Sequence, residues 1–156
     1  MIRNLNRKEL NMQISPPIIR KPNLPNLRVA VFVRSMCNGS LTSRSQRVHR
    51  IRELLDMVCR EPVKVVAVSD SSSQSFDRAG LAASVRAIET GEADLAVAES
   101  CYEISCNSRI VREVVKRCVD NGVRFIAFQD HIDTSEPDYA SYLEEYLSEC
   151  GDEDDE

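Results

Sequence analysis

Tryptophan is absent from this chain of 156 residues, and aromatic residues make up only 5% of it. Hydrophobic residues nevertheless reach 42%, so we expect an aliphatic core in a single domain. No run approaches 18 consecutive apolar residues, which predicts no membrane-spanning helix. No apolar stretch follows the first basic residues either, so we expect no secretory signal and a cytoplasmic protein.

Motifs for metals and nucleotides are also lacking. The six cysteines include no Cys-x-x-Cys pair, and Cys101 and Cys106 have no histidine nearby, which disfavours zinc and favours reduced core residues. His131 lies between Asp130 and Asp133, but three ligands in one turn without a distant fourth favour a surface histidine over a metal site. No glycine-rich phosphate loop follows any predicted strand. We therefore predict no cofactor and no metal.

Charge is unevenly distributed around a net value of −5. Residues 1–28 carry six basic residues and one acidic residue, whereas residues 144–156 carry eight acidic residues and no basic one. The proline-containing segment 1–27 reads as a flexible basic arm, which either touches phosphates or stays solvated. Residues 150–156 form an acidic tail that disfavours nucleic acid as a tight partner.

Hydrophobic periodicity predicts alternating strands and helices between the arm and the tail. This order is typical of a three-layer α/β domain, here residues 28–149, with a mainly parallel sheet of four to five strands. Sites in such sheets lie at the carboxyl ends of the strands. The predicted strands cover 28–34, 63–68, 94–98 and 123–128, and the predicted helices cover 43–59, 77–90, the region around 111–118, and 139–147.

The first predicted helix has a basic face opposite its apolar one. Arg44, Arg47, Arg50 and Arg52 lie on this face. It forms either a DNA-facing stripe or an ordinary solvated surface, and the second is the usual outcome.

Four motifs follow the predicted strands in order. Together, over about residues 28–139, they resemble the catalytic domain of the serine site-specific recombinases, the resolvase and invertase family. The motifs are the strand end Val31-Phe32-Val33-Arg34, the pair Ser40-Leu41, the stretch Ser75-Phe76-Asp77-Arg78-Ala79-Gly80-Leu81, and the region from Asn121-Gly122-Val123 to Ile132-Asp133-Thr134-Ser135.

The resemblance implies DNA strand exchange through a phosphoserine link. In that chemistry a serine attacks a DNA phosphodiester, arginines stabilise the charge on the phosphorus centre, and an acid protonates the leaving oxygen. By resemblance, Ser35 is the candidate nucleophile, and Arg34 and Arg78 are the candidate phosphate-binding cations. The residues that would contact DNA outside this site are not identified.

The chain departs from the family pattern at several positions. The family serine stands two residues after the strand-end arginine, where this chain has Met36, and Ser35 would face away from Arg34 on a regular strand. Tyr102 stands in place of the family acid, and Glu103 and Cys106 replace two family arginines. We therefore expect an impaired enzyme or, alternatively, a non-enzymatic interaction or regulatory module derived from a recombinase.

The differences from the family pattern also affect which partners we expect. The long dimerising helix and the DNA-binding region of the family are not recognisable in this sequence. DNA is therefore expected to bind weakly and non-specifically at most. A second copy of the chain or another recombinase remains an alternative partner, and a membrane is not expected.

Overall fold

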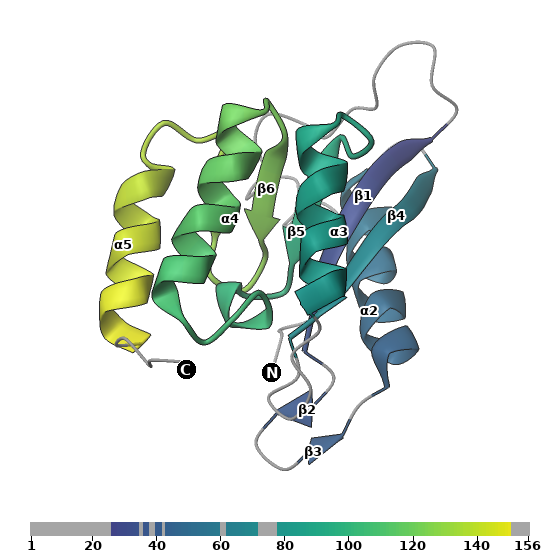
Figure 1. The fold of residues 1–156 in the computed structure, drawn as a ribbon, viewed down its shortest axis with the longest axis horizontal. Coiled ribbons are helices and arrows are strands. Elements are labelled where there is room, and N and C mark those ends of the chain that lie inside the picture. Colours follow the sequence, from purple (N-terminus) through teal and green to yellow (C-terminus); the bar gives the residue numbers. More distant parts are fainter. Residues whose placement is uncertain are drawn as a thin grey trace.

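The central element is a five-stranded sheet in the strand order β4-β1-β5-β6-β7 (Figure 1). This computed structural model describes residues 26–34, 36–37, 40–41, 43–59, 62–71 and 78–150. Four neighbouring strands pair in parallel and the fifth, β7, is antiparallel to β6. The strands are β1 (Leu27–Val33), β4 (Val63–Asp70), β5 (Leu95–Ala98), β6 (Arg124–Ala127) and β7 (Ile132–Asp133).

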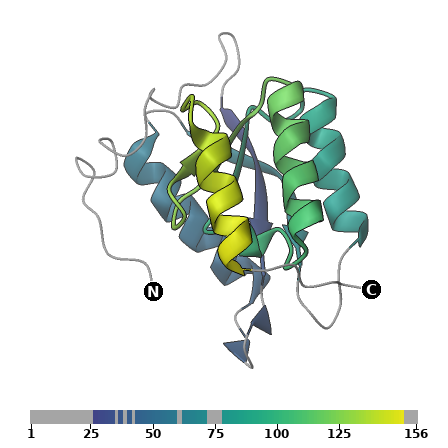
Figure 2. The same ribbon diagram turned by 90° about the vertical axis from the view of Figure 1, so that its left-hand side faces the viewer.

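Helices cover both faces of this sheet, which confirms the predicted three-layer α/β fold. Helix α2 lies on one side of the strands, whereas α3 and α4 lie on the other (Figure 2). Leu143 and Leu147 of α5 pack into the same cluster as α4, so α5 belongs to that second side. The helices are α2 (Arg44–Val58), α3 (Arg78–Glu89), α4 (Ser108–Asp120) and α5 (Tyr139–Cys150), with a short 3-10 helix η1 (Cys101–Glu103).

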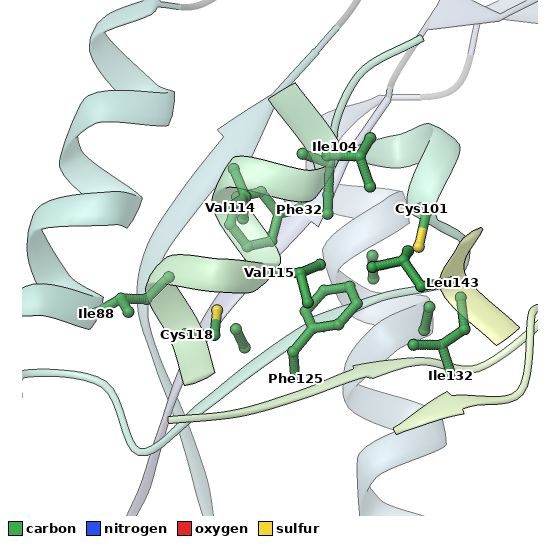
Figure 3. Packing of buried hydrophobic residues seen from close by; sticks show 14 of the residues in the cluster. Phe32, Ile88, Cys101, Ile104, Val114, Val115, Cys118, Phe125, Ile132 and Leu143 are labelled. Atoms are coloured by element: carbon green, nitrogen blue, oxygen red, sulfur yellow. The ribbon is translucent and has the colours of Figure 1, made fainter. Parts of the chain in front are cut away.

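Strand β1 is buried on both faces because helices lie above and below it. Val31 and Val33 pack toward α2, whereas Phe32 packs toward α3 and α4. This alternation follows from the two-residue period of a strand. Around Phe32 and Phe125 the cluster is almost wholly aliphatic, as the scarcity of aromatics predicted (Figure 3). No helix in the described part of the chain is long and apolar enough to cross a membrane.

Two short features were not among the predicted elements. Met36–Cys37 (β2) and Ser40–Leu41 (β3) pair as a small antiparallel ribbon. Ile132–Asp133 adds β7 to the sheet. Two-residue strands carry too little periodicity to be recognised in a sequence, because pairing with a neighbour defines them.

A buried ion pair fixes the amino end of the sheet. The Asp94 carboxylate accepts hydrogen bonds from the Arg28 backbone N–H (3.0 Å), from Nε (3.1 Å) and from Nη2 (2.9 Å). The Arg28 Nη2 atom also donates to the Gly91 carbonyl at 2.9 Å. The Asp94 side chain is only 4% exposed. This pair therefore joins the start of β1 to the start of β5.

We expect Asp94→Asn to lower the free energy of unfolding by about 1–3 kcal/mol, since hydrogen bonds between charged groups contribute roughly that much. The exposed pair Arg112–Glu144, with side chains 40% and 56% exposed, provides the matched control. Glu144→Gln should change the same free energy by less than about 1 kcal/mol. Urea denaturation of the three proteins measures both effects, and equal losses in the two variants would contradict the prediction.

Candidate functional site

The site lies where Arg34 follows β1, at the carboxyl end of the sheet. Arg34 is 3% exposed. Its backbone N–H donates to Glu103 Oε1 at 3.0 Å, and its guanidinium carbon lies 4.3 Å from the centre of the Tyr102 ring. The Arg34 Nε atom is buried and has no hydrogen-bond partner. The Arg34 guanidinium thus lies over an aromatic face, and its positive charge also favours the ionised form of Glu103.

Three arginines of α2 form ion pairs with acids at the same end of the sheet. A spacing of three residues places them along one side of the helix. The acids come from the end of β4, the end of β5 and η1. The three pairs are Arg44 Nε–Asp70 Oδ2 at 3.5 Å, Arg50 Nε–Glu99 Oε1 at 3.3 Å and Arg47 Nη1–Glu103 Oε1 at 3.5 Å.

The acidic partners are buried beneath the arginines. The side chains of Asp70, Glu99 and Glu103 are between 6% and 8% exposed, whereas that of Arg44 is 54% exposed. Burial raises the pKa of Glu103, opposed mainly by the charge of Arg47. Burial likewise raises the pKa of Glu99, opposed mainly by Arg50. Desolvation therefore outweighs attraction to the arginines at both carboxyls.

Serines at the end of β4 tie this strand to its neighbours. The Ser71 backbone N–H donates to the Val33 carbonyl at 2.9 Å, and its hydroxyl donates to the Glu103 carbonyl at 2.6 Å. The Ser69 hydroxyl is buried without a hydrogen-bond partner. Four of the five buried side-chain polar atoms that lack a hydrogen bond in the described residues belong to Arg34, Arg47, Ser69 and Glu99. Unsatisfied polar atoms thus gather at the carboxyl end of the sheet.

The turn after β6 closes the other side of this edge. Asp130 Oδ2 accepts the Cys101 backbone N–H at 2.7 Å, and the Gln129 backbone N–H donates to the Glu99 carbonyl at 2.6 Å. His131 is exposed and has a φ of 56°, a left-handed backbone conformation. No group of three His, Cys, Asp or Glu side chains within the described ranges is arranged to hold a metal ion.

The structure brings some of the sequence candidates together. Arg34, Tyr102 and Glu103 are in mutual contact at the strand ends. Cys106 lines a cavity of only about 20 Å³ together with Tyr102. Ser35 lies outside the described residues, and so does the side chain of Arg78, whose backbone begins α3. The register proposed for the nucleophile therefore remains a prediction.

Sequence reasoning missed the inner partners of the α2 arginines. It weighed a DNA-facing stripe against a solvated face, and the structure instead pairs Arg44, Arg47 and Arg50 with buried acids. A signal was available in the three-residue spacing of the arginines and in acids such as Asp70 and Glu99, which directly follow the apolar strand runs. Matching the two sets requires knowing that α2 crosses the strand ends.

The site is nearly neutral as a consequence. Four arginines at positions 34, 44, 47 and 50 lie among three carboxylates at positions 70, 99 and 103. Fixed carboxylates weaken the attraction of these arginines for a phosphate. The arrangement is thus better suited to holding α2 against the sheet than to stabilising a highly charged phosphoryl centre.

The buried Glu99 carboxyl should make the free energy of unfolding depend on pH. Because burial raises its pKa from 4.5, the folded protein binds this proton more tightly than the unfolded chain does. The contribution of Glu99 to the free energy of unfolding is fully present below pH 4.5, the pKa of the unfolded chain. It is lost as the pH rises through the raised pKa of the folded state. Glu99→Gln removes this titration, so we expect the variant to be more stable relative to the parent at pH 7 than at pH 4.

Urea denaturation at the two pH values measures this difference. Glu145→Gln, on the exposed surface of α5, serves as the control. A difference between parent and Glu99→Gln that does not change with pH would contradict the prediction.

Comparisons with known proteins support the fold. No family model matches the chain, and no curated protein matches it. Solved structures do match, among them the N-terminal catalytic domain of TP901-1 integrase and a resolvase family site-specific recombinase from Streptococcus pneumoniae.

The integrase domain has a TM-score of 0.60 and 21% identity, and the match covers 78% of this chain and 92% of that one. The recombinase has a TM-score of 0.57 and 18% identity, and the match covers 79% and 87% of the two chains. The fold expected from the four motifs is thus confirmed: this chain is built like the catalytic domain of a serine recombinase.

Proposed function

We propose that this chain is a serine recombinase-like domain that does not cleave DNA. The observation that carries this proposal is Glu103. By the motif resemblance it stands where the family has an arginine, and it lies buried against the backbone of Arg34 and beside the guanidinium of Arg47. A negative charge thus stands where phosphoryl transfer requires a positive one.

The charge argument rests on the transition state of phosphodiester cleavage. Negative charge develops on the phosphoryl oxygens and is stabilised by fixed cations. Loss of one such donor typically lowers a rate about 10²–10³-fold. Here two family arginines are replaced by Glu103 and Cys106, and the family acid is replaced by Tyr102. The combined loss should bring cleavage below detection.

Arg34 and Arg78 match arginines of the family, and Arg34 is the one whose side chain the structure describes. Its buried Nε atom lacks a hydrogen-bond partner, and the Tyr102 ring lies over its guanidinium. Glu103 accepts its backbone N–H. These contacts support a role for Arg34 in organising the strand ends, since within the described residues they join it to Tyr102 and Glu103.

We expect no covalent protein–DNA adduct when excess protein is incubated with supercoiled plasmid and the mixture is denatured. The reason is that Glu103 and Cys106 replace two family arginines and that Ser35, on a regular strand, would face away from Arg34. Denaturing gel electrophoresis of labelled DNA detects such an adduct. The matched control is Ser35→Ala. An adduct in the parent that disappears in this variant would identify Ser35 as a working nucleophile and overturn the proposal.

The second candidate function is a non-enzymatic interaction or regulatory module in the cytoplasm, with a second copy or another recombinase as partner. It is favoured by the ion pairs that already neutralise Arg44, Arg47 and Arg50, because paired arginines are less available to DNA phosphates.

DNA binding should accordingly be weak. We expect a dissociation constant of roughly 10⁻⁴ M or poorer at physiological salt, the level of non-specific binding. Fluorescence anisotropy with labelled duplexes of unrelated sequence measures it. The affinities should agree among the duplexes and should fall as salt increases. A tight complex with one duplex sequence would contradict this expectation.

A further inference from the structure

A hollow beside the edge strand of the sheet has a volume of about 660 Å³. We name it the α2–β4 hollow, because helix α2 forms one wall and strand β4 the other. Strand β4 is at the edge of the sheet, and the α2 side chains that line the hollow are mostly exposed. It is lined in part by Ser43, Arg44, Ser45, His49 and Arg52 of α2 and by Val65 of β4.

The outward surface of this hollow is positively charged. Residues 43–52 contain four arginines and no acidic residue, and the first turn of α2, where the helix dipole is positive, has none. The Asp70 partner of Arg44 is buried with 7% of its side chain exposed, whereas Arg44 is 54% exposed. Glu53, one turn further along, lies 3.8 Å from His49. A partner that approaches the hollow therefore meets a surface of mainly positive charge.

The chain itself contains a segment of complementary charge. Residues 152–156 are all acidic and follow α5 after Gly151. Their carboxylates are acceptors for arginine and serine donors, and hydrogen bonds between such charged groups are stronger than neutral ones. The hollow supplies an arginine donor in Arg52, and Arg44 lies beside it, already paired with Asp70. It also supplies hydroxyl groups in Ser43 and Ser45, which hydrogen-bond each other.

The hollow of the same copy is out of reach of this segment. Helix α5 packs against β7 at one edge of the sheet. Strand β4 is the opposite edge, and α2 lies on the face of the sheet away from α3 and α4 (Figures 1 and 2). The hollow lies between α2 and β4. Four strand spacings separate β7 from β4, which is roughly 19 Å before the chain passes to the other face. Six residues span at most about 20 Å when fully extended. A contact between the acidic residues and the hollow would therefore have to form between two copies.

We propose that residues 151–156 of one copy bind in the α2–β4 hollow of a second copy. The contact is held mainly by charge, so it weakens as salt shortens the screening length from about 10 Å at 0.1 M. The proposal does not depend on whether the domain cleaves DNA.

Sedimentation of the whole chain tests this proposal. We expect self-association at about 50 mM salt that weakens at least tenfold at about 500 mM. A chain ending at Cys150 and the hollow variant Arg52→Glu should each lose at least tenfold in self-association. The matched control Arg86→Glu makes the same charge change on the exposed surface of α3 and should associate like the parent. Circular dichroism verifies that the variants fold.

A peptide competition identifies the segment. The peptide Gly-Asp-Glu-Asp-Asp-Glu should dissociate the parent, and its neutral analogue Gly-Asn-Gln-Asn-Asn-Gln should not. A parent that is monomeric at low salt would overturn the proposal, even if it binds an added peptide or DNA. Association that survives the truncation, or that Arg86→Glu weakens as much as Arg52→Glu does, would overturn it as well.

Discussion

The carboxylate of Glu103 joins three parts of the molecule at the carboxyl end of the sheet. It accepts the backbone N–H of Arg34 after β1, it pairs with Arg47 of α2, and its own residue closes η1. Its carbonyl also accepts the Ser71 hydroxyl after β4. Because the group is buried, removing either partner would leave an uncompensated charge, which is far more destabilising than the loss of a surface pair.

Helix α2 is held against the sheet by such polar contacts as well as by apolar ones. Only Ile51, Leu55 and Val58 of its fifteen residues are buried. In the N-terminal half of the helix, Val48 packs against the core only partly buried, and Arg44, Arg47 and Arg50 pair with strand-end acids. The ion pairs therefore fix where α2 crosses the sheet, a positioning role that buried polar groups serve in other proteins.

The ion pairs between α2 and the strand-end acids also support the proposal that this domain does not cleave DNA. In a parallel α/β sheet the strand ends form the usual ligand-binding edge. This chain shares the fold of a recombinase catalytic domain. At its strand ends, however, carboxylates pair with the arginines and neutralise them. The positive charge that remains faces outward from α2, next to the edge strand β4. The ion pairs with the strand-end acids and the exposed lining of the hollow thus lie on different sides of one helix.

The sequence by itself determined the order of the main strands and helices, because each apolar run has the period of its element and ends at a polar turn. It placed Arg34 and Glu103 near one site through the motif resemblance. Only the tertiary structure decided that the α2 arginines pair with Asp70, Glu99 and Glu103, and that Ile132–Asp133 forms a fifth strand. Ion pairs between distant segments depend on how the helix crosses the sheet, and no local periodicity encodes that crossing.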